Sequence, residues 1–175
     1  HGRSTLIARK VSVITCCWNS EPYVADCIAS VQSQQGVEIE HVFVDGGSDD
    51  GTLERIQALP GNVKWVTGVR GGIAKAMNTG VDLASGEFIA HLHADDYYLR
   101  PASLATAVAQ LQSTGADWLF GRVMSDIQGQ QVPNSWTMPA FSLKRLLQGN
   151  FVAHPALLMR RTMFLQLGGF STDLK

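Results

Sequence analysis

The stretch EFIAHLHADD, residues 87–96, is an apolar run that ends in the adjacent carboxylates Asp95 and Asp96. Its apolar part has the length and composition of a buried strand. Two neighbouring carboxylates repel each other and are costly to remove from water, so a pair placed where a buried strand surfaces indicates a bound cation. The first prediction from this sequence is therefore a metal site at Asp95 and Asp96.

A second strand-like run, Ile39 to Val44, also ends in acidic residues. The loop that follows it, Asp45 to Thr52, reads DGGSDDGT. Serine and aspartate suit a helix cap, so this loop alone could be a cap and nothing more. In an open parallel sheet, however, ligands bind beyond the carboxyl ends of the strands. We therefore expect both acidic strand ends to face one crevice.

Strands and helices alternate along most of the chain, which is typical of a parallel sheet covered on both faces. The expected strands are 11–17, 39–44, 63–67 and 87–92, and the helices between and after them start near Asn19, at Thr52 and at Ile73, with a fourth at 101–112. Beyond Gly115 we expect a strand over 117–124, a hairpin turn at 127–131, a short helix at 141–147, a strand over 156–159 and a helix over 162–167. The predicted fold is an α/β three-layer sandwich whose mostly parallel sheet becomes mixed near its end.

Length and composition fit one globular domain. The chain has 175 residues, of which 45% are hydrophobic and 17% charged, and we assign residues 11–175 to that domain and 1–10 to an extension or tag remnant. A net charge of −1 offers no general attraction to nucleic acid. The three cysteines have no metal-like spacing and read as reduced core residues, which indicates a cytoplasmic protein.

No membrane-spanning run is expected, because no segment approaches about 18 consecutive apolar residues. The basic pair Lys144 and Arg145 supplies too few charges to anchor the chain on an anionic membrane. At most we expect peripheral contact with the inner face of the membrane.

The usual phosphate-binding loops are absent from the sequence. It contains no GxxxxGK[ST], and the glycines at 68, 71 and 72 do not fit GxGxxG. A diphosphate facing Asp45, Asp95 and Asp96 would be repelled unless a divalent ion bridged the carboxylate and phosphate oxygens. Oxygen ligands of this kind favour Mn²⁺ or Mg²⁺.

Histidines and one arginine are further candidates. His93 lies two residues before Asp95, and His154 ends an apolar segment in the way that pocket-lining polar residues often do. His91 reads as a structural core residue. Arg70 lies in a glycine-flanked stretch before a helix, from which it could reach a diphosphate, although a solvated surface arginine is an equal alternative.

Short motifs at the expected strand ends form an ordered series. They are VSVIT (11–15) with Asn19, VDGGSDDGT (44–52), AMNTG (76–80), ADD (94–96), NFVAH (150–154), RR (160–161) and GGF (168–170). This series resembles the family 2 glycosyltransferases of GT-A fold, and the resemblance spans nearly all of residues 11–174.

The resemblance implies roles for particular residues. Thr15 and Asn19 would line the nucleotide pocket, Asp45 would contact the base, and Asn78 would lie near the donor. The pair Asp95 and Asp96 matches the acidic motif that holds the metal and the diphosphate of a nucleoside diphosphate sugar, and His154 falls in the acceptor-side segment. His93 replaces an aspartate found in many members, so we group it with the donor contacts.

One departure concerns the general base. In the family this is an acidic residue soon after the GGF segment, and Asp173 comes too early to match it. We therefore expect the base to lie beyond Lys175 and the domain to be incomplete at its C-terminal end, with a homodimer as one way to cover an exposed apolar edge.

The implied function is inverting transfer of a sugar to the hydroxyl of a saccharide or lipid-linked acceptor, in the synthesis of cell-surface polysaccharide or glycolipid. Three alternatives stay open at this point: a nucleotide-sugar-binding module without catalysis, a sugar-phosphate nucleotidyltransferase, and a purely structural domain. Donor binding without turnover would indicate the binding module, and pyrophosphate release would indicate the nucleotidyltransferase. No response to nucleotide and Mn²⁺ would indicate the structural domain.

Overall fold

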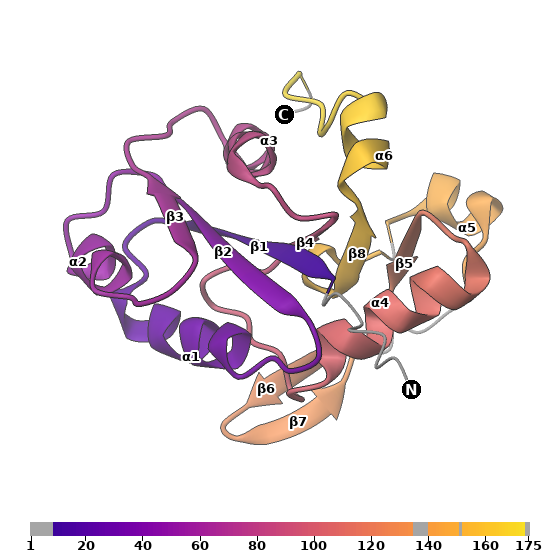
Figure 1. The fold of residues 1–175 in the computed structure, drawn as a ribbon, viewed down its shortest axis with the longest axis horizontal. Helices are drawn as coiled ribbons and strands as arrows, with labels where there is room; N and C mark the ends of the chain where they lie inside the picture. Colours follow the sequence, from indigo (N-terminus) through magenta and orange to yellow (C-terminus); the bar gives the residue numbers. More distant parts are fainter. Residues whose placement is uncertain (1–8, 135–139, 151, 174–175) are drawn as a thin grey trace, which may run out of the picture.

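A mixed sheet forms the centre of the structure, a computed structural model that describes residues 9–134, 140–150 and 152–173. Within these ranges six strands pair in the order β3-β2-β1-β4-β8-β5, and β6 and β7 form a separate hairpin (Figure 1). The strands are β1 (Lys10–Cys17), β2 (Glu38–Asp45), β3 (Val63–Val66), β4 (Phe88–His91), β5 (Trp118–Phe120), β6 (Met124–Ile127), β7 (Gln130–Pro133) and β8 (Leu157–Arg160). The helices are α1 (Glu21–Gln32), α2 (Thr52–Gln57), α3 (Ile73–Leu83), α4 (Ser103–Thr114), α5 (Leu143–Gln148) and α6 (Arg161–Gln166), with the 3-10 turn η2 (His154–Ala156).

The sheet changes from parallel to mixed where the sequence predicted it. Strands β1 to β4 run parallel, whereas β8 lies antiparallel between β4 and β5. The single strand predicted over 117–124 was wrong, because it is divided into β5 and β6. The Gly121 amide still donates to Ala156 O (2.8 Å), after which the chain leaves the sheet for the β6–β7 hairpin.

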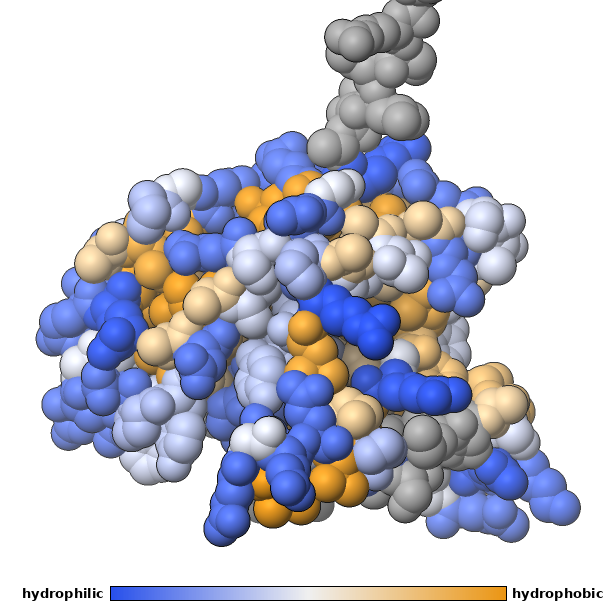
Figure 2. All heavy atoms as spheres, turned by 90° about the horizontal axis from the view of Figure 1, so that it is seen from below, coloured by the Kyte–Doolittle hydropathy of each residue, from blue (hydrophilic) through white to orange (hydrophobic). Residues whose placement is uncertain are grey.

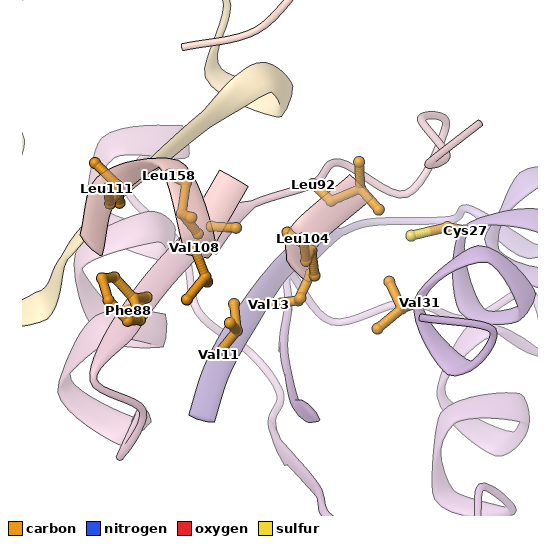
Figure 3. Packing of buried hydrophobic residues seen from close by; sticks show 11 residues of the cluster. Val11, Val13, Cys27, Val31, Phe88, Leu92, Leu104, Val108, Leu111 and Leu158 are labelled. Carbon is orange, nitrogen blue, oxygen red and sulfur yellow. The ribbon is translucent and has the colours of Figure 1, made fainter. Parts of the chain in front are cut away.

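Helices cover both faces of the sheet, which confirms the three-layer prediction. Helices α1 and α4 pack on one face, where their apolar residues meet those of β1, β4 and β8 (Figure 3). Helices α3 and α6 pack on the other face around Ile14, Ile89 and Phe164. The stripe predicted for α1, Val24, Cys27, Ile28 and Val31, is buried.

Helix α3 lies unusually close to β1. A Cβ atom added at Gly80 would come within 2.3 Å of Ile14 Cγ2, so only glycine permits this approach. The contact fixes α3 over the middle of the sheet, with its N-terminal end beside the loop that follows β3.

A buried charge stabilises the opposite end of the sheet from the acidic strand ends. Glu40 is fully buried in β2 and pairs with Lys64 (2.9 Å) and Lys10 (3.3 Å). It also accepts hydrogen bonds from Ser12 and from Ser85 Oγ (2.7 Å). Because these partners compensate the charge, Glu40 has a structural role.

The surface is mixed in polarity. On the face shown in Figure 2, hydrophilic residues cover much of the surface and apolar residues reach it in separate patches. In the described part of the chain, no helix has both the length and the apolar character needed to cross a bilayer. Cys16, Cys17 and Cys27 are free, as the sequence predicted.

Candidate functional site

The two acidic strand ends lie on the same edge of the sheet. Strand β1 separates β2 from β4, with Cys17 opposite Asp45 and Ile14 opposite His91. The loops that follow β2 and β4 therefore flank the carboxyl end of β1 on one edge of the sheet, and the crevice that they were expected to share stays a prediction.

Asp45 organises the loop after β2. Its carboxylate is fully buried and accepts hydrogen bonds from the amides of Gly47 (2.8 Å) and Ser48 (3.0 Å), from Thr67 Oγ1 (2.6 Å) and from the Ser48 hydroxyl. Burial alone would raise the pKa of Asp45, but these hydrogen bonds outweigh it and lower the pKa below its usual value. The carboxylate is thus ionised, and its hydrogen bonds hold the loop in place. Its contact with a nucleotide base stays a prediction, and it would require the base to replace one of these hydrogen-bond donors.

Asn19 connects the same loop to the turn after β1. Its backbone has a left-handed conformation (φ 48°), its amide donates to Ser48 Oγ (2.9 Å), and its side-chain oxygen accepts from the Asp49 amide (3.0 Å). Asn19 therefore belongs to the hydrogen-bond network of this loop, and its place in the nucleotide pocket stays a prediction. Thr15 does not reach the surface, because it is fully buried and bonded to His41 Nε2 (2.9 Å).

Trp18 is a site residue that the sequence reasoning missed. Its indole is 62% exposed and lies against Gly46, where an added Cβ would come within 3.3 Å of Trp18 Cβ. The Arg70 guanidinium lies 5.7 Å from the centre of the indole ring. The sequence feature that could have revealed it is its position as an aromatic residue directly before Asn19. An exposed aromatic face beside a polar loop can stack a nucleobase.

Arg70 extends over the loop after β2. Its Nη2 lies 3.1 Å from the position that a Cβ of Gly47 would take, and Gly47 itself has a positive φ of 88°. A larger residue at Gly47 would therefore meet both backbone strain and the guanidinium. This arrangement places a cation next to the acidic loop, where an anionic ligand needs one.

Asp95 and Asp96 form the second half of the site. Asp95 is exposed and Asp96 is half-buried in the turn after β4, where its amide donates to His93 O (3.0 Å). Burial and the negative charge of Asp95 raise the pKa of Asp96. A cation would relieve this repulsion.

Asp95 and Asp96 suit a metal ion that takes its remaining ligands from outside the protein. Among the described residues, no group of three or more histidine, cysteine or acidic side chains is arranged to hold a metal. Asp95 and Asp96 could supply two oxygen ligands, and phosphate and water would supply the others. Mg²⁺ is usually bound in this way, through one or two carboxylates and substrate phosphates.

Phe170 joins two further candidates on the α3 side of the sheet. Both amide atoms of Asn78 bond to its backbone, Nδ2 to Phe170 O and Oδ1 to Phe170 N, each at 2.9 Å. The Phe170 ring makes edge contacts with His91 and His154, each at 5.4 Å between centroids. Asn78 thus fixes the GGF segment, and its predicted donor contact stays a prediction.

His154 lies near the strand-end histidines. It is partly buried at the start of η2, and burial followed by the charge of His93 lowers its pKa. It lies beside Phe170, and its acceptor-side role stays a prediction.

Two buried histidines make stability sensitive to acid. Burial lowers the pKa of both His41 and His91 to about 3, and neither ring nitrogen of His91 has a hydrogen-bond partner among the described residues. A depressed folded-state pKa means that the unfolded chain binds the proton first, so stability is lost as the pH falls below about 6.5.

We expect the free energy of unfolding to fall by about 1.4 kcal/mol per histidine between pH 7.5 and pH 5.5. Urea unfolding at the two pH values measures this change. In His91→Phe, which keeps a ring of similar size, the contribution of His91, about 1.4 kcal/mol, should disappear. An unchanged pH dependence in that variant would show that His91 is not protonated on unfolding.

Both the sequence and the fold match a known family. The sequence profile described as Glycosyl transferase family 2 matches residues 12–166. Over 170 residues the chain is 32% identical to the uncharacterized glycosyltransferase MT1564 of Mycobacterium tuberculosis. The aligned segment covers 95% of this chain and 64% of MT1564.

Two solved structures share the fold. TarS of S. aureus, residues 1–349 in complex with UDP-GlcNAc, superposes with a TM-score of 0.77 at 27% identity, covering 93% of this chain and 48% of that one. The mannosyltransferase PcManGT of Pyrobaculum calidifontis, in complex with GDP-Man and Mn²⁺, superposes with a TM-score of 0.73 at 23% identity, covering 97% and 49%. The chain thus spans less than two thirds of MT1564 and about half of each of these two structures.

Proposed function

Since this chain belongs to glycosyl transferase family 2 and has the GT-A fold, we propose that it transfers a sugar from a nucleoside diphosphate sugar to an acceptor hydroxyl, with inversion at the anomeric carbon. The observation that carries the proposal is the convergence of the loop held by Asp45 and the carboxylates Asp95 and Asp96 on one edge of the sheet. The expected setting is the synthesis of polysaccharide or glycolipid.

In this proposal the nucleotide lies across the carboxyl end of β1. Its base stacks on Trp18, whose face is exposed beside Gly46. Arg70 would reach the diphosphate from the Asp45 loop, and Asp95 and Asp96 would hold a divalent cation. Mn²⁺ or Mg²⁺ would stabilise the negative charge that develops on the departing diphosphate.

The acceptor enters from the side of η2 and the GGF segment. His154 lines this approach, the amide of Asn78 keeps Phe170 in place, and His93 stays with the donor contacts. Deprotonation of the acceptor hydroxyl requires a general base, a role for which we propose an acidic residue.

Nucleotide release tests the proposed activity. The chain is incubated with Mn²⁺ and UDP-GlcNAc, GDP-mannose or a mixture of nucleoside triphosphate and sugar phosphate. Release of UDP or GDP, with the sugar passing to water or to an added acceptor hydroxyl, would support transferase chemistry. Donor binding without release would favour a binding module, and pyrophosphate release would favour a nucleotidyltransferase. UDP-GlcNAc is the first choice because TarS, at 27% identity, was crystallised with it.

Trp18→Ala should weaken nucleotide binding by about 5- to 150-fold, because base–aromatic stacking contributes about 1–3 kcal/mol per base. Calorimetric titration with UDP in the presence of Mn²⁺ measures the change. Tyr23→Ala is the matched control, since Tyr23 is an equally exposed aromatic (58%) on α1 outside the loop contacts. Equal affinities of the Trp18 and Tyr23 variants would contradict the stacking assignment.

A further inference from the structure

A buried hydroxyl in the turn after β4 has no hydrogen-bond partner. The turn reads DDYY, residues 95–98, so two tyrosines directly follow the acidic pair. The hydroxyl oxygen of Tyr98 is buried and unpaired among the described residues, and its ring packs against the core cluster of α1, α4, β1 and β4. Buried hydroxyls in folded proteins nearly always have a partner. An unpaired one therefore indicates a bond that forms in another state of the protein.

Asp96 has the complementary deficiency. Its carboxylate is half-buried and accepts no hydrogen bond from any residue that the structure describes. Asp96 and Tyr98 both line the cavity between β4, α4 and the β6–β7 hairpin. Burial is the main cause of the raised pKa of Tyr98 and of the Cys27 thiol, and the negative charge of Asp96 contributes to both. The carboxylate and the hydroxyl therefore lie near the same thiol, on the α1 side of the sheet.

A carboxylate that binds a cation benefits from such a donor. Metal-binding carboxylates are usually hydrogen-bonded themselves, and these partners orient the ligand. A tyrosine hydroxyl is protonated near neutral pH and can donate one hydrogen bond to a carboxylate oxygen. Such a bond would occupy one oxygen of Asp96 and leave the other for the cation.

We propose that Tyr98 is a positioning residue for the cation: its hydroxyl donates to Asp96 when the metal is bound and holds one carboxylate oxygen so that the other faces the metal. This inference rests on the proposed metal-bound donor site and makes it more specific. In the free chain the bond is not formed, so the unpaired hydroxyl lowers stability there and favours the metal-bound state.

The test is Tyr98→Phe, which removes the hydroxyl and keeps the ring. Its affinity for UDP in Mn²⁺, measured by calorimetric titration, should fall about 10- to 100-fold, as is typical when a hydrogen-bond partner of a metal ligand is lost. The urea midpoint of the metal-free variant should stay the same or rise, because an unpaired buried hydroxyl is removed. A purely structural role predicts the reverse, a lower urea midpoint with unchanged affinity.

Tyr97→Phe is the matched control, since it makes the same change one residue earlier. The Tyr97 hydroxyl is already paired, because it donates to Asp126 of the β6–β7 hairpin (2.5 Å). This variant should keep its affinity for UDP in Mn²⁺ within about twofold, as expected for a surface substitution. Equal losses of affinity in Tyr97→Phe and Tyr98→Phe, or no loss in Tyr98→Phe, would overturn the inference.

A second cycle of variants tests whether Tyr98 acts through Asp96. In an Asp96→Ala background, which retains Asp95 as a ligand, Tyr98→Phe should cause no further loss of UDP affinity beyond about twofold, since residues that act as a unit are not additive. The same loss in both backgrounds would show that the hydroxyl contacts the nucleotide itself, which would also overturn the inference.

A measurement on the unmodified chain covers the case in which Tyr98→Phe does not fold. The chain has three tyrosines, so ¹³C labelling at Cζ gives three signals, which Tyr23→Phe and Tyr97→Phe assign by elimination. The Tyr98 signal should shift when UDP and Mg²⁺ are added together and stay in place with UDP alone. A Tyr98 signal that never moves while UDP binds would contradict the inference and leave the donor proposal intact. If UDP does not bind in either metal, the donor proposal itself fails.

Discussion

Asp45→Ala is expected to lower the free energy of unfolding by about 3 kcal/mol and to weaken UDP binding at least tenfold. The substitution removes a buried, ionised acceptor and leaves the amides of Gly47 and Ser48 and the hydroxyl of Thr67 without the partner that they have now. Urea unfolding and calorimetric titration on the same protein preparation measure both effects.

The control for Asp45→Ala is Asp49→Ala in the same loop. Asp49 is exposed, so this variant removes the same charge without disturbing the buried hydrogen bonds, and its stability should stay within about 0.5 kcal/mol of the unmodified chain. The pair also separates two roles of Asp45. Lost nucleotide binding with unchanged stability would show that Asp45 contacts the base directly, as the family resemblance implies, and would contradict the structural role.

The double substitution Asp95→Ala/Asp96→Ala should have the largest effect on binding. Without both carboxylates the chain offers no ligand pair for the cation, and we expect at least a hundredfold loss of UDP affinity in Mn²⁺, which corresponds to about 2.8 kcal/mol. In the absence of metal and nucleotide the same variant should be at least as stable as the unmodified chain. The reason is that burial and the charge of Asp95 raise the pKa of Asp96, so the pair repels in the free protein.

Asp82→Ala is the matched control for the acidic pair. Asp82 is an exposed carboxylate on α3 and belongs to neither strand-end loop. Its removal should leave the affinity for UDP unchanged within about twofold, since charges that are exposed and distant are screened by salt.

Local patterns predicted most of the fold. The apolar stripe of α1 and the β-branched run of β1 follow the periods of a helix and a strand, and both elements occur where the periods place them. The break between β5 and β6 was not predictable in this way. It depends on β8, which pairs with β5 only as far as Gly121 and comes from a distant part of the sequence.

The candidate site was predictable where function depends on chain position, and less so where it depends on tertiary contacts. Asp95 and Asp96 were found because a strand end positions them. The hydrogen bonds that hold Asp45 in its loop were not predictable, because one of the donors, Thr67, follows β3. Asn78 bonds to Phe170 across 92 positions, a contact that no local spacing reveals. Trp18 was missed because it lies between the predicted strand 11–17 and the helix start near Asn19, outside both periodic patterns.

The most direct test of the proposed donor site is calorimetric titration of the chain with UDP and with GDP, each with and without Mn²⁺, repeated on Asp95→Ala/Asp96→Ala. Our account predicts that one nucleotide binds in a metal-dependent manner and that the double substitution removes this binding. Absence of binding to either nucleotide at saturating Mn²⁺, or metal-dependent binding that the double substitution leaves intact, would contradict the assignment of Asp95 and Asp96 to the metal and the diphosphate.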